Sequence, residues 1–235
     1  MTRTTNARIA GSTFLIYIAL GVAGMILSGK ATGVEGTAAK LAGIAQHATE
    51  FRFAMLLGLT TCFAALVLGI TLYRIVCDQD HDLAMLALTC RVCEGLLGAI
   101  SVSASMGLLS LVTAAGANAP DAATVQTLGT FLFAMPGWTG KLGATFFAVG
   151  STFFSYLLLR GRVVPVSLAW LGVFASGLLV VCLPLQLAGF FHGLVTSLMW
   201  IPMAAFEVPL GVWLLIKGVA PVDESRSISR RAAGI

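Results

Sequence analysis

Residues 83–112 have the sequence LAMLALTCRVCEGLLGAISVSASMGLLSLV, a long apolar run that carries two charged side chains, Arg91 and Glu94. A transmembrane helix needs roughly 20 consecutive apolar residues, so this stretch predicts a membrane-spanning helix. As a straight helix from Leu83 to Thr113 it would measure ~46 Å. We therefore expect it either to tilt strongly or to project beyond the bilayer on its outer side.

The rest of the chain has the same character. Of its 235 residues, 58% are hydrophobic and 10% are charged, and the mean hydropathy is +0.95, whereas soluble domains carry about 25% charged residues. The long continuous runs exclude an outer-membrane barrel, whose strands are short and alternating. An all-α polytopic membrane protein is predicted, a bundle of six transmembrane helices at Ile9–Ser28, Phe51–Val76, Leu83–Val112, Trp138–Leu159, Pro165–Leu187 and Gly193–Ile216.

Two outer loops are long enough to hold structure of their own. In residues 30–50, four apolar residues recur at roughly helical spacing: Val34, Leu41, Ile44 and Ala48. This spacing predicts a short amphipathic helix on the outer surface. Residues 116–137 have an apolar part that is too short to span, which favours an interfacial or re-entrant helix.

The basic residues predict the orientation of the chain. Nine of the fourteen Lys and Arg fall on the side that holds both termini and the second and fourth loops: Arg3, Arg8, Arg74, Arg160, Arg162, Lys217, Arg226, Arg230 and Arg231. The opposite loops hold three. The positive-inside rule then predicts that both termini are cytoplasmic. We expect residues 1–218 to form a single six-helix transmembrane domain and residues 219–235 to form a polar cytoplasmic tail.

The net charge of +4 follows from this cytoplasmic edge, where Lys and Arg meet anionic head groups. It therefore predicts membrane lipid as a partner and no nucleic acid. Whether the chain forms a homo-oligomer or joins a partner subunit is left open by the sequence.

Arg91, Glu94 and Glu207 lie deep inside apolar segments, where a charge costs ~2.5–3.5 kcal/mol even on the gentlest scales. Counted from the cytoplasmic ends of their helices, they lie ~12, ~16 and ~15 Å deep. A shared depth is a precondition for contact. Arg91 and Glu94 are also three residues apart, so they can approach each other on one helix.

Small, polar and aromatic residues extend from these charges at helical spacing. The third span places Glu94, Gly98, Ser101 and Ser105 on one face. The fourth aligns Lys141, Thr145, Ala148, Thr152 and Ser155, and the sixth aligns Thr196, Trp200, Met203, Glu207 and Gly211. Such faces are typical of packed or cavity-lining helices, and three of them predict one interior polar pocket. Pro202 and Pro209, on either side of Glu207, favour local kinks.

The candidate ligand-binding residues are therefore Arg91, Glu94, Glu207, Trp200 and Lys141. Lys141 ranks second, because it lies near the outer end of its span and is long enough to snorkel outwards. The trio of Arg91 and two carboxylates has a formal charge of −1. We expect such a site to hold a proton, a cation or an amine. The structural alternative is that Arg91 bridges both carboxylates and joins helices.

Three functions follow. The first is a membrane-embedded binding protein for a small amphiphile or lipid, with proton-linked transport as a variant. The second is an intramembrane enzyme that acts on a lipid or isoprenoid chain, and the third an accessory subunit of a larger complex. No catalytic residue is assigned, and neither a metal nor a cofactor is expected. Cys90 and Cys93 form a CxxC inside a span, where core packing is favoured over redox or metal chemistry.

Short motifs along the chain resemble a bacterial integral membrane family catalogued as domain of unknown function 4386. The motifs are Ala7-Arg8-Ile9-Ala10-Gly11, Arg91-x-x-Glu94, the run from Tyr156 through Arg160 to Pro165, Trp170 and Gly172, and the closing set Pro202, Glu207, Pro209, Leu210, Trp213, Leu214, Lys217 and Gly218. The resemblance implies a helical integral membrane protein of the bacterial inner (cytoplasmic) membrane and brings no established activity with it.

Overall fold

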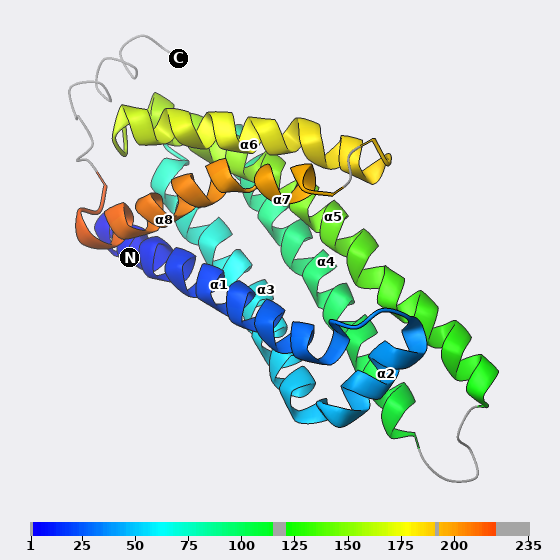
Figure 1. Cartoon of the computed structure of the whole chain (residues 1–235). Coiled ribbons are helices and arrows are strands. Elements are labelled where there is room, and N and C mark those ends of the chain that lie inside the picture. Colours follow the sequence, from blue (N-terminus) through cyan, green and yellow to red (C-terminus); the bar gives the residue numbers. More distant parts are fainter. Residues whose placement is uncertain (1, 115–120, 191–192, 220–235) are drawn as a thin grey trace, which may run out of the picture.

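The computed structural model describes residues 2–114, 121–190 and 193–219, and these residues fold entirely into helices and their connections (Figure 1). The helices are α1 (Arg3–Thr32), α2 (Thr37–Gln46), α3 (Ala48–Val76), α4 (His81–Thr113), α5 (Ala122–Arg160), α6 (Val166–Leu187), α7 (Val195–Leu198) and α8 (Ile201–Ile216). Six segments are long and apolar enough to cross a membrane, with α7 and α8 together forming the sixth, so the predicted fold class is confirmed. The predicted tail, from 219 onwards, lies outside the described residues except for Val219.

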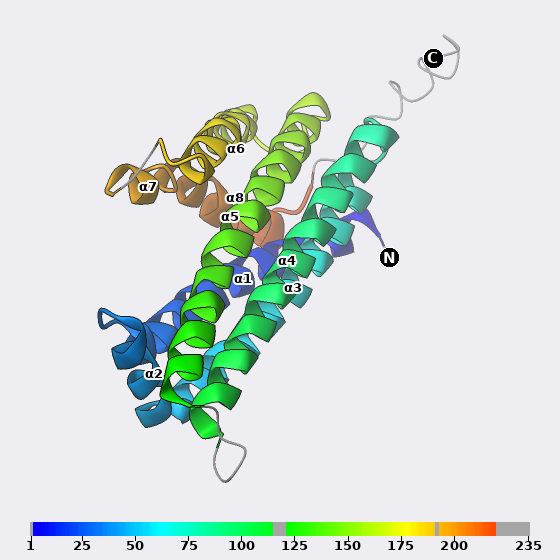
Figure 2. The same cartoon turned by 90° about the vertical axis from the view of Figure 1, so that its right-hand side faces the viewer.

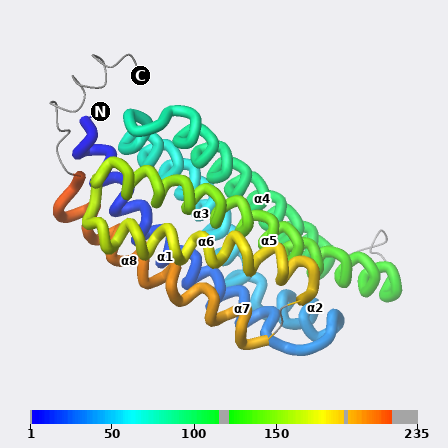
Figure 3. Tube along the Cα trace, turned by 90° about the horizontal axis from the view of Figure 1, so that it is seen from above, coloured from blue at the N-terminus to red at the C-terminus, as the bar shows by residue number. Residues whose placement is uncertain are grey.

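The long helices contact one another in a closed order. α1 packs on α3, α3 on α4, α4 on α5, α5 on α6, α6 on α8, and α8 returns to α1. The most extensive pairing is between α4 and α5, which run side by side in both views (Figures 1 and 2). Seen from above, α6 and α8 cover one part of the bundle, and α2 lies at the other end (Figure 3). α1 and α5 are not neighbours in this order.

The predicted short helix of the first outer loop is present as α2. It buries Leu41 and Ile44, which join Phe51 and Leu108 in a small core at the end of the bundle away from the start of α1. The hydroxyl groups of Thr37 and Thr130 lie 3.1 Å apart and link α2 to α5. α2 is thus packed against other helices through its apolar face.

The separate interfacial or re-entrant helix expected within residues 116–137 is a wrong prediction. Residues 115–120 lie outside the described part, and the remainder is the first half of a continuous α5 that passes through Pro136. Asp121 starts this helix by accepting a hydrogen bond from the Thr124 backbone N–H, at 2.7 Å. Before the proline, Leu132 packs close to Gly107 of α4. Pro136 removes only one backbone N–H donor. Packing against α4 is therefore enough to keep the chain helical through it.

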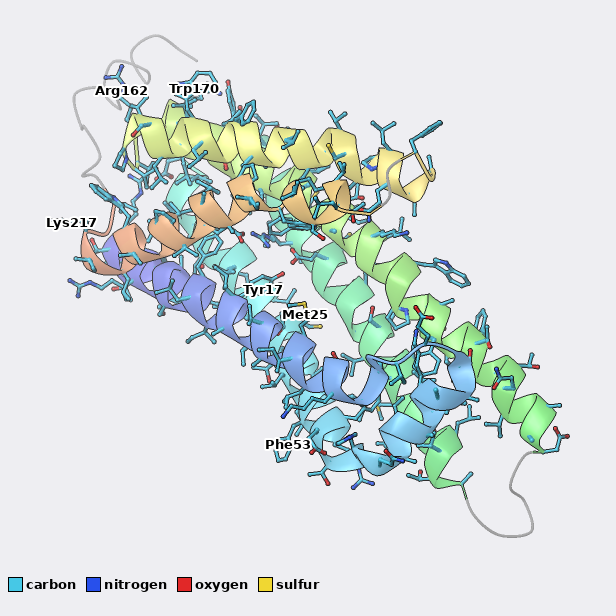
Figure 4. The ribbon with its side chains drawn as sticks, in the orientation of Figure 1. Tyr17, Met25, Phe53, Arg162, Trp170 and Lys217 are labelled. Carbon is cyan, nitrogen blue, oxygen red and sulfur yellow. The ribbon has the colours of Figure 1, made fainter. Side chains whose placement is uncertain are left out.

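The sixth span is divided. A turn at Met199 and Trp200 separates the short α7 from α8, and α8 begins with Pro202 in its first turn. At the other end of α8, Lys217 lies with Arg162 at the end of the bundle where α1 begins (Figure 4). The Arg3 guanidinium donates to the Ile75 carbonyl at 2.7 Å at this same end. Several predicted cytoplasmic basic residues are thus brought to one end of the molecule.

Close contact between α1 and α8 depends on Gly11. A Cβ built there would lie 2.5 Å from the backbone nitrogen of Leu215 and 2.6 Å from the carbonyl oxygen of Gly211. Gly29, on the same helix, has open space around it among the described residues.

We expect Gly11→Ala to lower stability by about 1–3 kcal/mol through overpacking, even though Ala is the better helix former by about 1 kcal/mol. Gly29→Ala is the matched control and should be neutral or slightly stabilising. The measurement is the Tm of each variant in the same detergent. Equal Tm changes for the two variants would contradict the close packing.

Candidate functional site

Arg91 lies in the interior of α4 with only 1% of its surface exposed. Its Nη1 donates to Oε2 of Glu94 at 2.9 Å, one turn further along the same helix. On the side of α3, Gly69 makes room for the arginine stem, because a Cβ at that position would lie 2.9 Å from Cβ of Arg91. The guanidinium is therefore held by Glu94 on its own helix, and the absence of a side chain at Gly69 of α3 leaves space for the arginine stem.

Helix α5 adds two further contacts to the guanidinium. Phe147 of α5 presents its ring to Arg91, with the guanidinium carbon 4.6 Å from the ring centroid. Nη2 of Arg91 lies 3.4 Å from the hydroxyl of Ser151, also on α5. A cation over an aromatic face is stabilised most where water is excluded, as it is here.

Glu94 has a hydrogen-bond partner on each carboxylate oxygen. Oε2 accepts from Arg91, and Oε1 accepts from the hydroxyl of Tyr17 on α1, at 2.7 Å. Tyr17 lies on α1 among the helices, whereas Phe53 and Trp170 point away from the bundle (Figure 4). The sequence-predicted site lacked Tyr17, although its depth in the first span was a signal that could have found it.

Glu207 reaches the same cluster from α8 and is 7% exposed. Its Oε1 lies 4.0 Å from Nη2 of Arg91, which is the outer limit for an ion pair. Within the described part of the chain this oxygen is buried and has no hydrogen-bond partner. Arg91 therefore does not bridge the two carboxylates equally: it is hydrogen-bonded to Glu94 and only adjacent to Glu207.

Glu94 and Glu207 line a cavity of about 490 Å³ between the helices, whereas Arg91 is not among its lining residues. Glu94, Gly98, Ser101 and Ser105, the face predicted for the third span, all line it. The other lining residues used below come from α1, α3 and α5 and from the turn before α8: Tyr17, Gly21, Thr61, Thr139, Gly140, Phe147 and Trp200.

The two remaining candidates have different outcomes. Trp200 lines the cavity beside Phe147, and the two ring centroids are 6.0 Å apart. Lys141 is half-buried and is not among the lining residues, so the structure does not bring it to the trio.

The predicted face of the fourth span is the wrong one. Ser155, on that face, turns towards α6 instead, where a Cβ on Gly172 would lie 2.6 Å from its hydroxyl. Its small residues thus serve helix packing. Neither Ser151 nor Phe147 was predicted, because the sequence does not show which side of this helix faces the cavity.

At the end of the cavity away from Glu207 the lining comes from α1, α3, α4 and α5. Gly21 of α1 and Gly140 of α5 both line the cavity and are exposed on the surface of the molecule. No described atom lies within 4 Å of a Cβ built at either position. These two glycines, called the mouth glycines below, mark an opening between two helices that are not neighbours in the packing order.

Removal of the buried cation is expected to be costly. In Arg91→Met, Glu94 and Glu207 face each other without a counter-charge, and we expect a loss of about 3–5 kcal/mol. Arg160→Met is the matched control: its ion pair with Asp80, at 3.2 Å, lies half-exposed at a helix end and contributes at most about 1 kcal/mol.

The measurement is the Tm in detergent, with Arg91→Met/Glu94→Gln as a third variant that should recover part of the loss. Equal Tm values for the two single variants would show that the charge of Arg91 is not needed to compensate the buried carboxylates.

Comparison with known proteins identifies the family. The family model described as Domain of unknown function (DUF4386) matches residues 9–218 of the chain. No curated protein and no solved structure shows significant similarity to it. The matched range covers all six long apolar segments almost completely, together with Arg91, Glu94 and Glu207. The chain is therefore a polytopic membrane protein that belongs to the DUF4386 family.

Proposed function

We propose that this protein binds a small amphiphile or lipid in its membrane-embedded cavity, with the polar end of the ligand at Glu207 and Glu94. The observation that carries the proposal is the buried Oε1 of Glu207, which has no hydrogen-bond partner among the described residues. Its side chain lines a cavity whose other polar groups are largely paired. Its volume of about 490 Å³ falls within the ~300–1,000 Å³ of small-molecule sites.

The rest of the cavity is suited to an apolar chain. Its hydroxyl groups already have partners: Thr61 and Ser105 donate to carbonyls one turn back in their own helices. Ser101 and Thr139 hydrogen-bond each other at 2.6 Å across α4 and α5. A hydroxyl that is already paired can lie against hydrocarbon without the cost of an unmade hydrogen bond. The cavity is thus charged at one end, and along the rest of its wall the hydroxyl groups named here are already hydrogen-bonded. This pattern matches the charged head and apolar chain of an amphiphile.

Entry is proposed to occur from the bilayer, between α1 and α5. The mouth glycines leave the cavity wall without side chains at this opening. Around them, the outer surfaces of the helices carry large apolar residues such as Met25 and Trp138, which are exposed as lipid-facing residues are. A lipophilic ligand can then reach the cavity without crossing water.

An intramembrane enzyme would need the same cavity, so its existence does not separate the two functions. Binding is favoured because both oxygens of Glu94 are engaged in holding the site together, one by Arg91 and one by the Tyr17 hydroxyl. Proton-linked transport would add a pH dependence to binding, through Glu207 together with Glu94, Arg91 and Tyr17. A Glu207→Gln variant with unchanged binding at every pH would remove that extension.

The proposed function predicts that filling the mouth depletes a bound molecule. Gly21→Leu and Gly140→Leu add side chains where the fold has room for them. Protein purified from membranes should carry a co-purifying amphiphile in the wild type and at least about tenfold less of it in these variants. Mass spectrometry of the extracted small molecules measures this.

Gly29→Leu is the matched control, because Gly29 is equally open, lies on the same helix as Gly21, and does not line the cavity. It should retain the wild-type amount. Identical extracts from all four proteins would contradict a ligand in this cavity.

We also propose that the protein lies in the bacterial cytoplasmic membrane with both termini in the cytoplasm. Supporting this, Arg3, Arg74, Arg160 and Lys217 lie at or near the ends of helices that meet at one end of the bundle. The energetic reason is the attraction between Lys or Arg and anionic cytoplasmic lipids.

The orientation predicts opposite reactivities for two loops. In a cysteine-free background, Glu35→Cys lies between α1 and α2, and Asp78→Cys lies between α3 and α4. A membrane-impermeant maleimide added to intact spheroplasts should label the first and not the second. Labelling of Asp78→Cys alone would reverse the assignment.

A further inference from the structure

The charges around the cavity do not balance. Arg91 supplies one positive charge, and Glu94 and Glu207 supply two negative ones, so the trio has a formal charge of −1 when both carboxyls are ionised. Glu94 is satisfied by Arg91 and Tyr17. The imbalance therefore falls on Glu207, whose side chain is more than nine-tenths buried and lines the cavity.

A buried acceptor of this kind calls for a donor. An unsatisfied charged group in a low-dielectric interior costs several kcal/mol, and a charge-assisted hydrogen bond removes that cost. A divalent metal is a poor match, because Ca²⁺ takes six to eight oxygen ligands and the described residues gather no third acidic or histidine group here. A carboxylate or phosphate head group would add a second negative charge and be repelled.

Aromatic rings border the same space. Phe147 and Trp200 line the same cavity as Glu207, and Phe147 already faces the Arg91 guanidinium. The indole of Trp200 has no cation partner in the described chain. Aromatic faces stabilise ammonium groups, most of all where water is excluded.

We infer that the ligand of this cavity carries a primary or secondary ammonium head group, which donates a hydrogen bond to Oε1 of Glu207 and lies near Trp200. Its apolar chain extends along the paired hydroxyls towards the mouth glycines. This inference rests on the proposed function and narrows it to one class of amphiphile. An ammonium supplies both the missing charge and the missing donor.

Four probes that share one chain and differ in head group test the inference: decylamine, decyltrimethylammonium, decanol and decanoate. Binding is measured by titration calorimetry to the protein in nanodiscs of a zwitterionic phosphocholine lipid, after subtraction of empty nanodiscs. Wild type should bind decylamine at least about tenfold more tightly than decanol, because the hydrogen bond is charge-assisted. Decyltrimethylammonium has the charge without the N–H and should fall between them, and decanoate should be weakest.

Glu207→Gln should lose the preference for decylamine over decanol and still bind decanol. The variant is close in shape, and its own Tm reports whether it is folded. Glu207→Asp keeps the charge and should keep the preference at reduced affinity, so it tests the inference if Glu207→Gln does not fold. Glu50→Gln removes a half-buried carboxylate of α3 that does not itself line the cavity, and this control should behave as wild type.

The outcomes are distinct. Equal binding of decylamine and decanol, or a preference that survives in Glu207→Gln, overturns the ammonium inference and leaves amphiphile binding intact. Tightest binding of decanoate also overturns it. No binding of any probe to wild type overturns the inference, and the co-purification experiment then decides the proposed function separately. Nanodiscs that contain an ethanolamine phospholipid separate the sources: competition with decylamine identifies a lipid head group, and no competition identifies a free amine.

Discussion

Burial of the Arg91 guanidinium in an apolar bundle is the constraint on which the arrangement of the other helices depends. An isolated charge in the membrane interior is costly, and here the cation is 1% exposed. The guanidinium is compensated by the carboxylate of Glu94 on its own helix, and it contacts the Phe147 ring and the Ser151 hydroxyl of α5. Tyr17 then ties α1 to that carboxylate. One charge thus specifies how three long helices approach one another.

Glu207 stands in contrast, because it is buried without being used in this way. It belongs to α8, which contacts α1 and α6 and follows the turn at Trp200. Apolar residues of similar volume commonly stabilise a fold as well as or better than a buried ionic group. Stability alone therefore does not explain a carboxylate at the edge of this cavity, whereas the proposed ligand would.

Much of the fold could be predicted from the sequence, because hydropathy and length suffice to place spans in a membrane. The shared depth of Arg91, Glu94 and Glu207 also followed from the helical rise alone, and contact between Arg91 and Glu207 is consistent with it. The orientation of α5 about its axis did not follow. In water an amphipathic pattern marks the buried face, but in lipid both the packed and the exposed faces are apolar, so Ser151 and Ser155 could not be assigned to different sides. The residues before Pro136 were for a similar reason wrongly predicted to form a separate helix. Neighbouring helices stabilise a proline within a span, so α5 continues through it.

The position of the mouth glycines along their helices has a consequence for polarity. Gly21 and Gly140 lie ~27 and ~30 Å from the ends of α1 and α5 where the basic residues gather, whereas Glu207 lies ~14 Å from that end of α8. The hydrocarbon layer is ~30 Å thick. With cytoplasmic termini the opening faces the outer leaflet, yet the polar end of an occupant would lie deeper than its tail. The bound molecule would stand inverted relative to the lipids beside it and would share the polarity of the opposite leaflet.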